Sequence, residues 1–210
     1  MSNIKVVMGR GSNASGKTTI AKDLIVMSSD VETWSWNAPL FDGDVDKYPS
    51  VYATVMKDIG WAVVGAYSSD KKMGGCDVLG GCHTVWKVQR AVADILNDRG
   101  NLKGIYYEGM MISTITSTFY DFMMDLKQYN VDPYFVIFRT TVEGCINRIK
   151  SRGTMKPNLN IENIANKCEL AIRSGKRLEQ LGGIPVKWID VEYIPKDMML
   201  LAFLHAIGEI

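Results

Sequence analysis

Residues 4–20 read IKVVMGRGSNASGKTTI, and the expected fold follows from this stretch outward. The stretch opens with a short apolar, β-branched run of the kind found in buried strands. Residues 11–18 then match the pattern G-x-x-x-x-G-K-[ST] in full. The glycines let the backbone curl so that successive N–H groups point at one anion, and a helix that begins near Gly16 adds the positive end of its dipole. The stretch therefore predicts a strand, a phosphate-binding loop and a helix, in that order.

The side chains of this loop predict that the bound anion is a nucleoside triphosphate with Mg²⁺. Lys17 can reach the β- and γ-phosphates as a point charge, and the Thr18 hydroxyl can ligate the metal. The alternative is a surface turn rich in glycine and serine, which the flanking strand and helix patterns disfavour. We therefore expect ATP and Mg²⁺ as cofactors. The predicted cofactor-binding residues are consecutive in the loop: Gly11, Ser12, Asn13, Ala14, Ser15, Gly16, Lys17, Thr18 and Thr19.

On this motif the chain resembles the P-loop kinases, the superfamily that includes nucleoside and nucleotide kinases. The resemblance implies an ATP-dependent phosphotransferase with an alcohol group as acceptor. The loop and the residues on either side of it carry this match most strongly, and shorter motifs along the chain are considered below.

The composition fits one α/β domain that lies away from membranes. The chain has 210 residues, of which 47% are hydrophobic, enough for a substantial core. A net charge of +1 excludes a general attraction to polyanions. The four cysteines lack C-x-x-C spacing and predict reduced thiols rather than a zinc site or disulfides. Because the chain starts with a strand and no apolar run approaches the roughly 20 residues of a membrane span, we expect no signal peptide, no membrane contact and a cytoplasmic protein.

Hydrophobic periodicity divides the chain into alternating strands and helices. Strands are expected at residues 4–7, 31–37, 51–57, 61–67, 102–109, 133–139 and 184–191. Helices are expected at residues 18–29, 82–97, 113–129, 141–153, 160–181 and 196–210, the fifth of them interrupted at Gly175. The alternation predicts a three-layer α/β fold of the P-loop kinase type over residues 1–210, with about five mainly parallel strands and helices on both faces. A hairpin over residues 51–67 and a small lid around residues 148–160 complete the prediction.

Glu108 ends the strand expected at residues 102–109. An acid at the carboxyl tip of a strand next to the loop strand is where carboxylates that support Mg²⁺ or orient a nucleophile are found in P-loop enzymes. The alternative is a structural Glu that braces a loop. We expect Glu108 to act in catalysis and, with Thr18, at the metal.

The acceptor site is expected in the glycine-rich loop SSDKKMGGCDVLGG at residues 68–81. It directly follows a strand, and in open α/β sheets ligands bind beyond the carboxyl ends of the strands. Gly74 and Gly75 would allow close approach of the backbone, and Asp77 would accept or orient the proton of an acceptor hydroxyl. The alternative is a mobile surface loop.

Asp44, Tyr67, Trp86 and Arg90 complete the predicted substrate site. Asp44 lies in the run FDGDVD, which is otherwise a solvated turn, and is the second choice for the proton acceptor. Tyr67 and Trp86 could stack on a base, as could Trp36, for which a place in the core is the alternative. Arg90 could face a substrate or lie on a solvated helix face.

Arg148 and Arg152 end the helix expected at residues 141–153, four residues apart on one face. Basic residues also suit the carboxyl end of any helix, which is the alternative explanation. The functional interpretation is a lid whose arginines fold over the ATP phosphates and stabilise charge in the transition state.

A closer resemblance rests on GGCD at residues 74–77, YEG at 107–109 followed by Ser113, and TTVEGCINRIKSR at 140–152. Together these motifs are similar to phage-encoded P-loop kinases, some of which phosphorylate the hydroxymethyl group of 5-hydroxymethyluracil within DNA. The resemblance implies a phage protein in the cytoplasm of its host and a base flipped out of the duplex to reach the γ-phosphate. It implies further that DNA phosphates contact a local basic groove, for which the candidates are Lys71, Lys72, Arg90 and Arg173.

Three functions therefore remain open. The first is a kinase of a modified base in DNA, and the second is a kinase of a free nucleotide, nucleoside or small metabolite. The third is an ATPase or nucleotide-dependent switch, which is disfavoured because the chain lacks four apolar residues followed by Asp and lacks Asn-Lys-x-Asp. The first two functions differ in whether the acceptor site is an open groove or a closed pocket.

Overall fold

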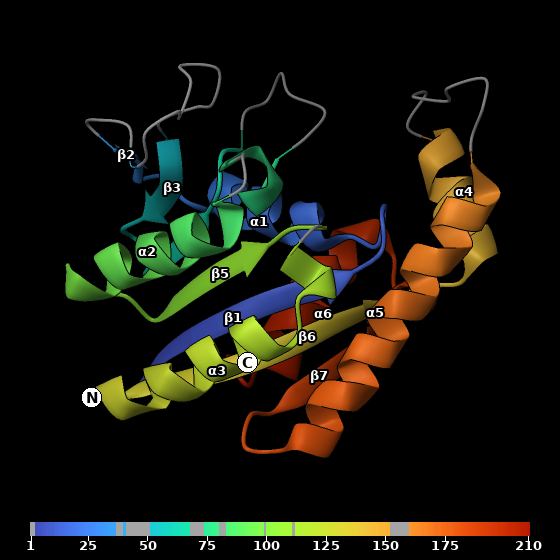
Figure 1. Cartoon of the computed structure of the whole chain (residues 1–210). Helices are drawn as coiled ribbons and strands as arrows, with labels where there is room; N and C mark the ends of the chain where they lie inside the picture. The colour runs from blue at the N-terminus through green and yellow to red at the C-terminus, as the bar shows by residue number, and fades with distance from the viewer. Residues whose placement is uncertain are drawn as a thin grey trace.

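The computed structural model describes residues 3–36, 40, 51–67, 74–79, 83–98, 100–110, 112–151 and 160–210. Within these ranges seven strands form one sheet in the order β2-β3-β4-β5-β1-β6-β7, with helices on both faces (Figure 1). The strands are β1 (Ile4–Gly11), β2 (Val31–Ser35), β3 (Val51–Met56), β4 (Trp61–Val64), β5 (Gly104–Glu108), β6 (Val131–Arg139) and β7 (Val186–Asp190). The helices are α1 (Lys17–Met27), α2 (Thr84–Asn97), α3 (Ser117–Leu126), α4 (Val142–Ser151), α5 (Ile161–Leu181) and α6 (Met199–Ala206).

The sheet confirms the expected α/β class but is larger than expected. The strands β4, β5, β1, β6 and β7 run parallel to one another, and β1 lies in the middle of these five. The hairpin strands β3 and β4 pair antiparallel, and β2 pairs antiparallel with β3. The count of about five strands was too low because the hairpin and β2 extend the same sheet instead of lying outside it.

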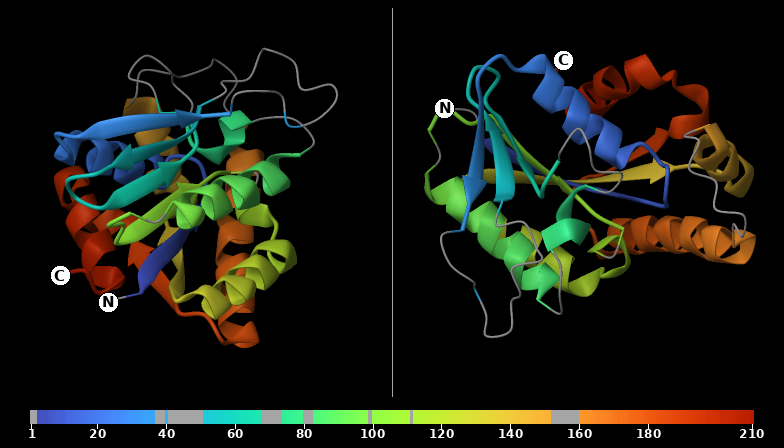
Figure 2. Two further views of the ribbon diagram at one scale, coloured as in Figure 1. Left: turned by 90° about the vertical axis from the view of Figure 1, so that its left-hand side faces the viewer. Right: turned by 90° about the horizontal axis from the view of Figure 1, so that it is seen from above.

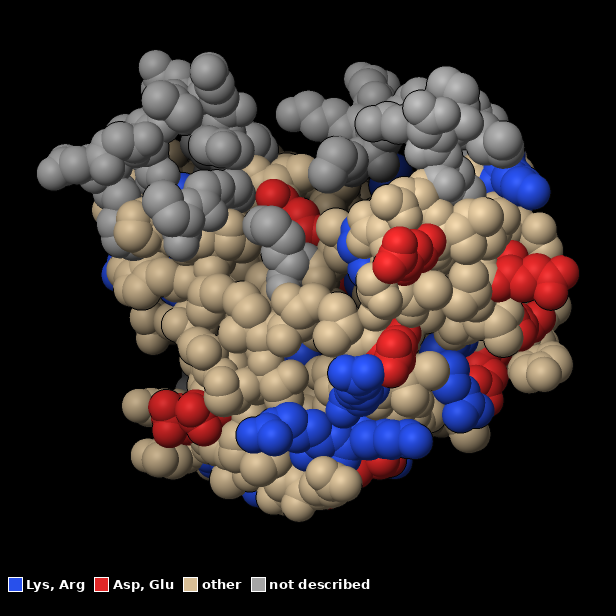
Figure 3. Space-filling model, turned by 45° about the vertical axis from the view of Figure 1, so that its right-hand side comes forward, with Lys and Arg blue, Asp and Glu red and all other residues tan. Residues whose placement is uncertain are grey.

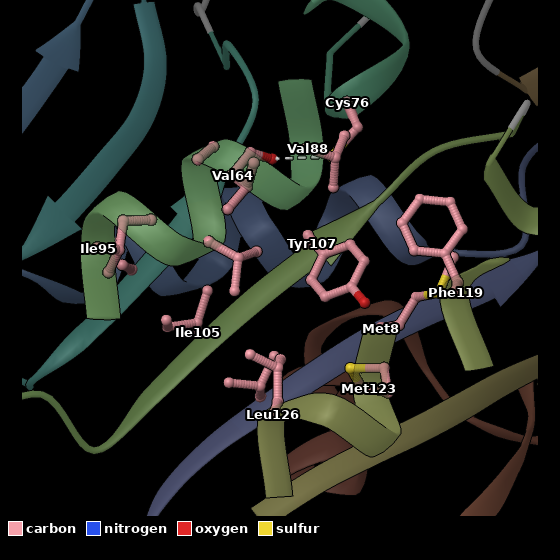
Figure 4. Packing of buried hydrophobic residues seen from close by; sticks show 14 of the residues in the cluster. Met8, Val64, Cys76, Val88, Ile95, Ile105, Tyr107, Phe119, Met123 and Leu126 are labelled. Atoms are coloured by element: carbon pink, nitrogen blue, oxygen red, sulfur yellow. Dashed lines mark hydrogen bonds between the residues drawn. The ribbon is translucent and has the colours of Figure 1, made fainter. Parts of the chain in front are cut away.

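Two apolar layers hold the helices on the sheet, because parallel strands are stable where both of their faces are covered. One layer lies under α2, α3 and α5 and includes Val88, Phe119 and Leu178. Figure 4 shows its centre, where Tyr107 of β5 lies near Phe119 of α3. The other layer lies under α1 and α6. The view from above in Figure 2 shows helices on the two sides of the sheet.

Two of the predicted helices are clearly shorter than expected, because 3₁₀ turns take up part of each stretch. The stretch expected as one helix at 113–129 is α3 flanked by the 3₁₀ turns Ile112–Thr114 and Lys127–Tyr129. The last helix is shorter than expected, because the 3₁₀ turn Lys196–Met198 precedes α6. The first turn of α5 is capped by Asn160, whose side chain accepts a hydrogen bond from the N–H of Asn163 at 2.8 Å. None of the helices in the described ranges is long and apolar enough to cross a membrane.

Gly175 does not interrupt α5, contrary to the prediction. The helix is continuous from Ile161 to Leu181. A Cβ atom on Gly175 would lie 2.5 Å from the indole ring of Trp188 in β7 and 3.0 Å from Ile137 in β6. The glycine therefore allows α5 to approach the sheet closely, and its low helix propensity is offset by packing that no sequence pattern displays.

The register between β1 and β5 positions the candidate site. The two strands pair in parallel, with Gly9 opposite Glu108. The carboxyl end of β5 consequently lies beside the strand that leads into the loop at residues 11–18. This register brings the acid at the tip of β5 to the loop at residues 11–18.

Candidate active site

The loop between β1 and α1 has the backbone of an anion-binding nest. Ala14 has a φ of 56° and Gly16 a φ of 93°, both in the left-handed region. Alternation of left- and right-handed residues turns successive N–H groups toward one point. Gly16 is the N-cap of α1, and its carbonyl accepts from the N–H groups of Thr19 and Ile20 at 3.0 and 3.2 Å. The remaining N–H groups of the first helical turn are thereby aimed at the concave side of the loop.

Lys17 places a buried cation at the mouth of this loop. Its ammonium donates to the carbonyls of Gly11 and Ser12, both at 2.8 Å, and to the Ser15 hydroxyl at 3.3 Å. The side chain is thus folded across the loop instead of reaching into solvent. An ammonium in this position can exchange carbonyl oxygens for phosphate oxygens with little movement.

Glu108 lies against the start of α1. Its side chain is 3% exposed, and its Oε1 accepts from the Thr18 hydroxyl at 2.9 Å and from the Tyr67 hydroxyl at 3.4 Å. Burial raises the pKa of Glu108, and the charge of Asp77 adds to this increase. Lys17 and the two hydroxyls oppose the increase, because they favour the ionised carboxylate.

The Thr18 hydroxyl and the Glu108 carboxylate fit the requirements of Mg²⁺. Both are hard oxygen donors, and they lie within hydrogen-bond distance of each other at the loop. Across the described ranges no cluster of three or more His, Cys, Asp or Glu side chains is arranged to hold a metal. Mg²⁺ does not require such a cluster, because it usually takes one or two protein ligands and completes its shell with phosphate and water.

Asp77 and Gly75 of the predicted acceptor loop lie at the same corner. Asp77 is in the 3₁₀ turn Cys76–Leu79, and its Oδ2 accepts from the N–H of Met110 at 2.6 Å. Gly75 has a φ of 84°, and a Cβ atom there would lie 2.4 Å from Oε1 of Glu108. Only glycine permits this approach, so the backbone at Gly75 lies directly against the buried carboxylate.

Tyr67 and Gly74 lie at this corner, whereas Arg90 lies on an exposed face of α2. A Cβ atom on Gly74 would lie 3.1 Å from the Tyr67 ring. Trp86 is 42% exposed on α2. The exposed Arg90 side chain pairs with Asp94 at 2.8 Å, the i,i+4 pair of a solvated helix face.

The other residues assigned to a nucleic-acid groove are similarly placed or lie outside the described part of the chain. Arg173 pairs with Glu169 on the exposed face of α5. On the face shown in Figure 3, basic and acidic side chains lie intermixed. Asp44, Arg152, Lys71 and Lys72 fall outside the described residues. Trp36 stacks on Tyr52, with ring centroids 4.4 Å apart, and packs against the core instead of offering a free face.

Helix α4 contacts the loop directly. The Cys145 thiol donates to the carbonyl of Asn13 at 2.8 Å. Arg148, predicted to reach the phosphates, is half-buried and donates to the carbonyl of Val191 at the end of β7. This hydrogen bond ties one nitrogen of the Arg148 guanidinium to the segment that follows β7.

Two residues at the site were not predicted. The Tyr106 hydroxyl of β5 donates to the carbonyl of Lys17 at 3.1 Å and braces the start of α1. Arg10 is buried immediately before the loop. A charged residue that follows the apolar run Val6–Met8 is a signal that the sequence offered for Arg10, whereas a tyrosine in a strand is too common to be one.

A small hollow lies between the loop, the segment after β5 and α5. Lys167 projects from α5 into this region and forms no hydrogen bond or ion pair with any residue that the structure describes. The lining residues are Gly11, Ser12, Met110, Ser113, Thr114, Lys167, Leu170 and Ala171. Lys167 therefore adds a cation beside the first residues of the loop.

Comparison with known proteins identifies related folds at low sequence identity. No protein-family model matches the chain, and no curated protein sequence matches it. Among solved structures, the YorR protein of Bacillus subtilis in complex with phosphorylated GDP has a TM-score of 0.50 at 12% identity, over 97% of this chain and 95% of that one. Deoxyadenosine kinase of M. mycoides with dCMP and a flexible dCDP has a TM-score of 0.44 at 15% identity, over 99% and 100%. Shikimate kinase of Acinetobacter baumannii with shikimate has a TM-score of 0.45 at 13% identity, over 99% and 94%. The likeness to YorR shows a shared fold.

Proposed function

We propose that the chain is an ATP-dependent kinase that transfers the γ-phosphoryl group of ATP to an acceptor hydroxyl. The observation that carries this proposal is the contact between Thr18 and Glu108, which joins the loop to a buried carboxylate at the tip of β5. The acceptor loop lies against the same carboxylate through Gly75. Phosphate, metal and acceptor chemistry thus converge on one corner of the sheet. YorR, which shares the fold, was solved with a phosphorylated nucleotide, and this agrees with a nucleotide at the loop.

The proposed mechanism relies on positioning and charge. The loop N–H groups and Lys17 hold the phosphates, while Thr18 and Glu108 would hold Mg²⁺ and its water shell. The metal supplies charge neutralisation when bound. Asp77 accepts the proton of the acceptor hydroxyl. At the same time the oxygen of that hydroxyl forms a bond to the γ-phosphorus of ATP. The bond between the γ-phosphorus and the β-phosphate oxygen breaks, and ADP leaves. Arg148 is the proposed arginine for the charge that develops on the transferring group.

For the acceptor, we infer the hydroxymethyl group of 5-hydroxymethyluracil in phage DNA. This inference rests on the motifs at residues 74–77, 107–109 and 140–152. A free nucleotide or another small hydroxyl compound is the alternative. The alternative is favoured by the pairing of Arg90 and Arg173 with carboxylates, because these arginines then offer less charge to a DNA backbone.

The test is transfer of label from γ-³²P-ATP to separate acceptors: mononucleotides, ordinary DNA and DNA that carries 5-hydroxymethyluracil. Label in the modified DNA alone supports the base kinase, and label in mononucleotides supports the alternative. Free phosphate with no labelled acceptor contradicts a kinase and favours an ATPase.

The same assay separates the roles of the side chains. Asp77→Asn keeps an oxygen for the N–H of Met110 but removes the base, so we expect turnover to fall by about 10²-fold or more. Lys22→Ala, which changes a charge in the same helix as Lys17, is the control variant. We expect its turnover to be close to that of the unaltered protein. A near-normal rate in Asp77→Asn would move the role of the base to another carboxylate.

A further inference from the structure

Arg10 is a buried cation in the strand that leads into the loop. Its side chain is 0% exposed, between the apolar residues of β1 and the first glycine of the loop motif. A guanidinium taken out of water costs several kcal/mol unless its donors are satisfied.

The partners of Arg10 belong to the segment that follows β5 and to α5. Nη2 donates to the carbonyl of Ser113 and to the hydroxyls of Ser174, at 2.7 Å, and Thr116, at 3.4 Å. Nη1 donates to the carbonyl of Ile115 at 3.3 Å. One side chain therefore joins β1, the segment 112–116 and α5.

No carboxylate neutralises this cation among the described residues. Its guanidinium lies 5.9 Å from the ring centre of Phe135. Nε of Arg10 and the Tyr107 hydroxyl are both buried and have no hydrogen-bond partner within the described ranges. Burial lowers the pKa of Arg10 to about 10, so the side chain is charged at neutral pH.

The segment that Arg10 holds carries the groups of the acceptor corner. The Ser113 hydroxyl donates to the carbonyl of Gly109 at 2.5 Å, and Gly109 directly follows Glu108. The N–H of Met110 donates to Asp77. A chain of hydrogen bonds thus runs from Arg10 through Ser113 to the backbone between the two carboxylates.

We propose that Arg10 is a positioning residue for phosphoryl transfer, which holds the backbone after Glu108 against the loop strand and so sets the distance between the phosphate side and the acceptor side of the site. This proposal rests on the proposed function. Because Arg10 is fully buried, it acts through these backbone groups and does not touch the substrate. The forked guanidinium suits this task because its N–H groups point in several fixed directions. The single ammonium of a lysine could not reach all four of these acceptors.

The test compares Arg10→Met and Arg10→Lys with Met123→Ala, a control that removes volume from the same core layer but not from this network. We expect both Arg10 variants to lose about 10- to 100-fold in kcat, with the Kd of a fluorescent ATP analogue changed by less than about threefold. Met123→Ala should lose stability without this loss in kcat. Normal kcat in folded Arg10→Met, or an equal loss in Met123→Ala, would overturn the proposal.

Two further measurements test the proposal even if Arg10→Met does not fold or if no acceptor is known. Ser174→Ala removes one partner and leaves Arg10 in place, so a smaller loss of kcat in the same direction is expected if Arg10→Met does not fold. Amide hydrogen exchange of residues 112–116 should become faster in Arg10→Lys and in Ser174→Ala. If no acceptor is labelled by the unaltered protein, the proposed function fails, and unchanged exchange in both variants then rejects the positioning role separately.

Discussion

Glu108 shows how a single residue at this site works against stability. Its carboxyl is buried, lies near Asp77 and has a raised pKa. A carboxyl whose pKa is higher in the folded than in the unfolded state keeps its proton longer in the folded state. Its contribution to the free energy of unfolding therefore declines as the pH rises from the ordinary value of 4.5 through the folded pKa. Buried carboxyls with a raised pKa are often found at sites where a charge takes part in chemistry.

We predict that Glu108→Gln lowers phosphoryl transfer by about 10²-fold or more while the protein becomes no less stable at pH 7.5. The amide oxygen can still accept from Thr18 and Tyr67, and the unfavourable burial of charge is removed, so the free energy of unfolding should not decrease. Thermal unfolding at several pH values measures this. The difference between variant and parent should shrink toward pH 4.5. A less stable variant with an unchanged pH dependence would contradict the assignment of the raised pKa to Glu108.

At the scale of elements, α5 and β7 illustrate how packing outweighs helix propensity. Glycine is among the least favourable residues inside a helix, yet Gly175 lies in the middle of α5. The indole of Trp188 occupies the space that a Cβ atom would need. That indole is itself held, because its N–H donates to Glu179 at 2.6 Å and Arg139 lies over its ring. The ring has little freedom to move aside.

We predict that Gly175→Ala destabilises the protein by about 1–3 kcal/mol, because overpacking exceeds the gain of about 1 kcal/mol in helix propensity. Chemical unfolding of the purified variant measures the change. The matched control is Asn166→Ala, an exposed position in the same helix, which should be neutral or slightly stabilising. Stabilisation by both substitutions would mean that Trp188 yields and that the close approach of α5 is not required.

At the scale of the whole molecule, the loop joins the two sides of the sheet. It begins at β1, the middle of the five parallel strands, and continues into α1, which packs with α6 on one face. Helix α4 contacts it through Cys145, and α5 faces its first residues. A ligand that binds the loop therefore contacts a junction of several elements and should stabilise the folded state as a whole.

We predict that Mg–ATP at about 100 times its Kd adds about 2.7 kcal/mol to the free energy of unfolding, which for a chain of this size corresponds to an increase in Tm of about 5–10 °C. Lys17→Ala should keep its fold but lose this increase together with phosphoryl transfer. Thermal unfolding with ATP, with ATP and chelator, and without ligand measures the effect. An unchanged increase in Lys17→Ala would contradict nucleotide binding at the loop, and an unchanged increase with chelator would contradict a role for Mg²⁺.

Much of the fold was predictable because its signals are local. The strand, loop and helix at residues 4–27, the hairpin of β3 and β4, and the alternation of strands with helices all follow from periodicity and turn residues over short stretches. The placement of Glu108 beside the loop strand was predictable for the same reason, since acids at the tips of neighbouring parallel strands meet at one edge. The number of strands that join the sheet was not predictable, because the pairing between β2 and β3 joins residues about 20 positions apart.

The sequence by itself determined that this chain has the G-x-x-x-x-G-K-[ST] pattern between a strand and a helix of an α/β fold, because those features depend on residue types at fixed spacing. Only the tertiary structure decided that Gly75 lies against Glu108, that Arg90 pairs with Asp94 on a solvated face, and that Arg10 is buried among carbonyl and hydroxyl acceptors. The physical reason is that the burial and the partners of a side chain are set by residues far away in the chain. A pattern of spacing along one segment contains no information about them.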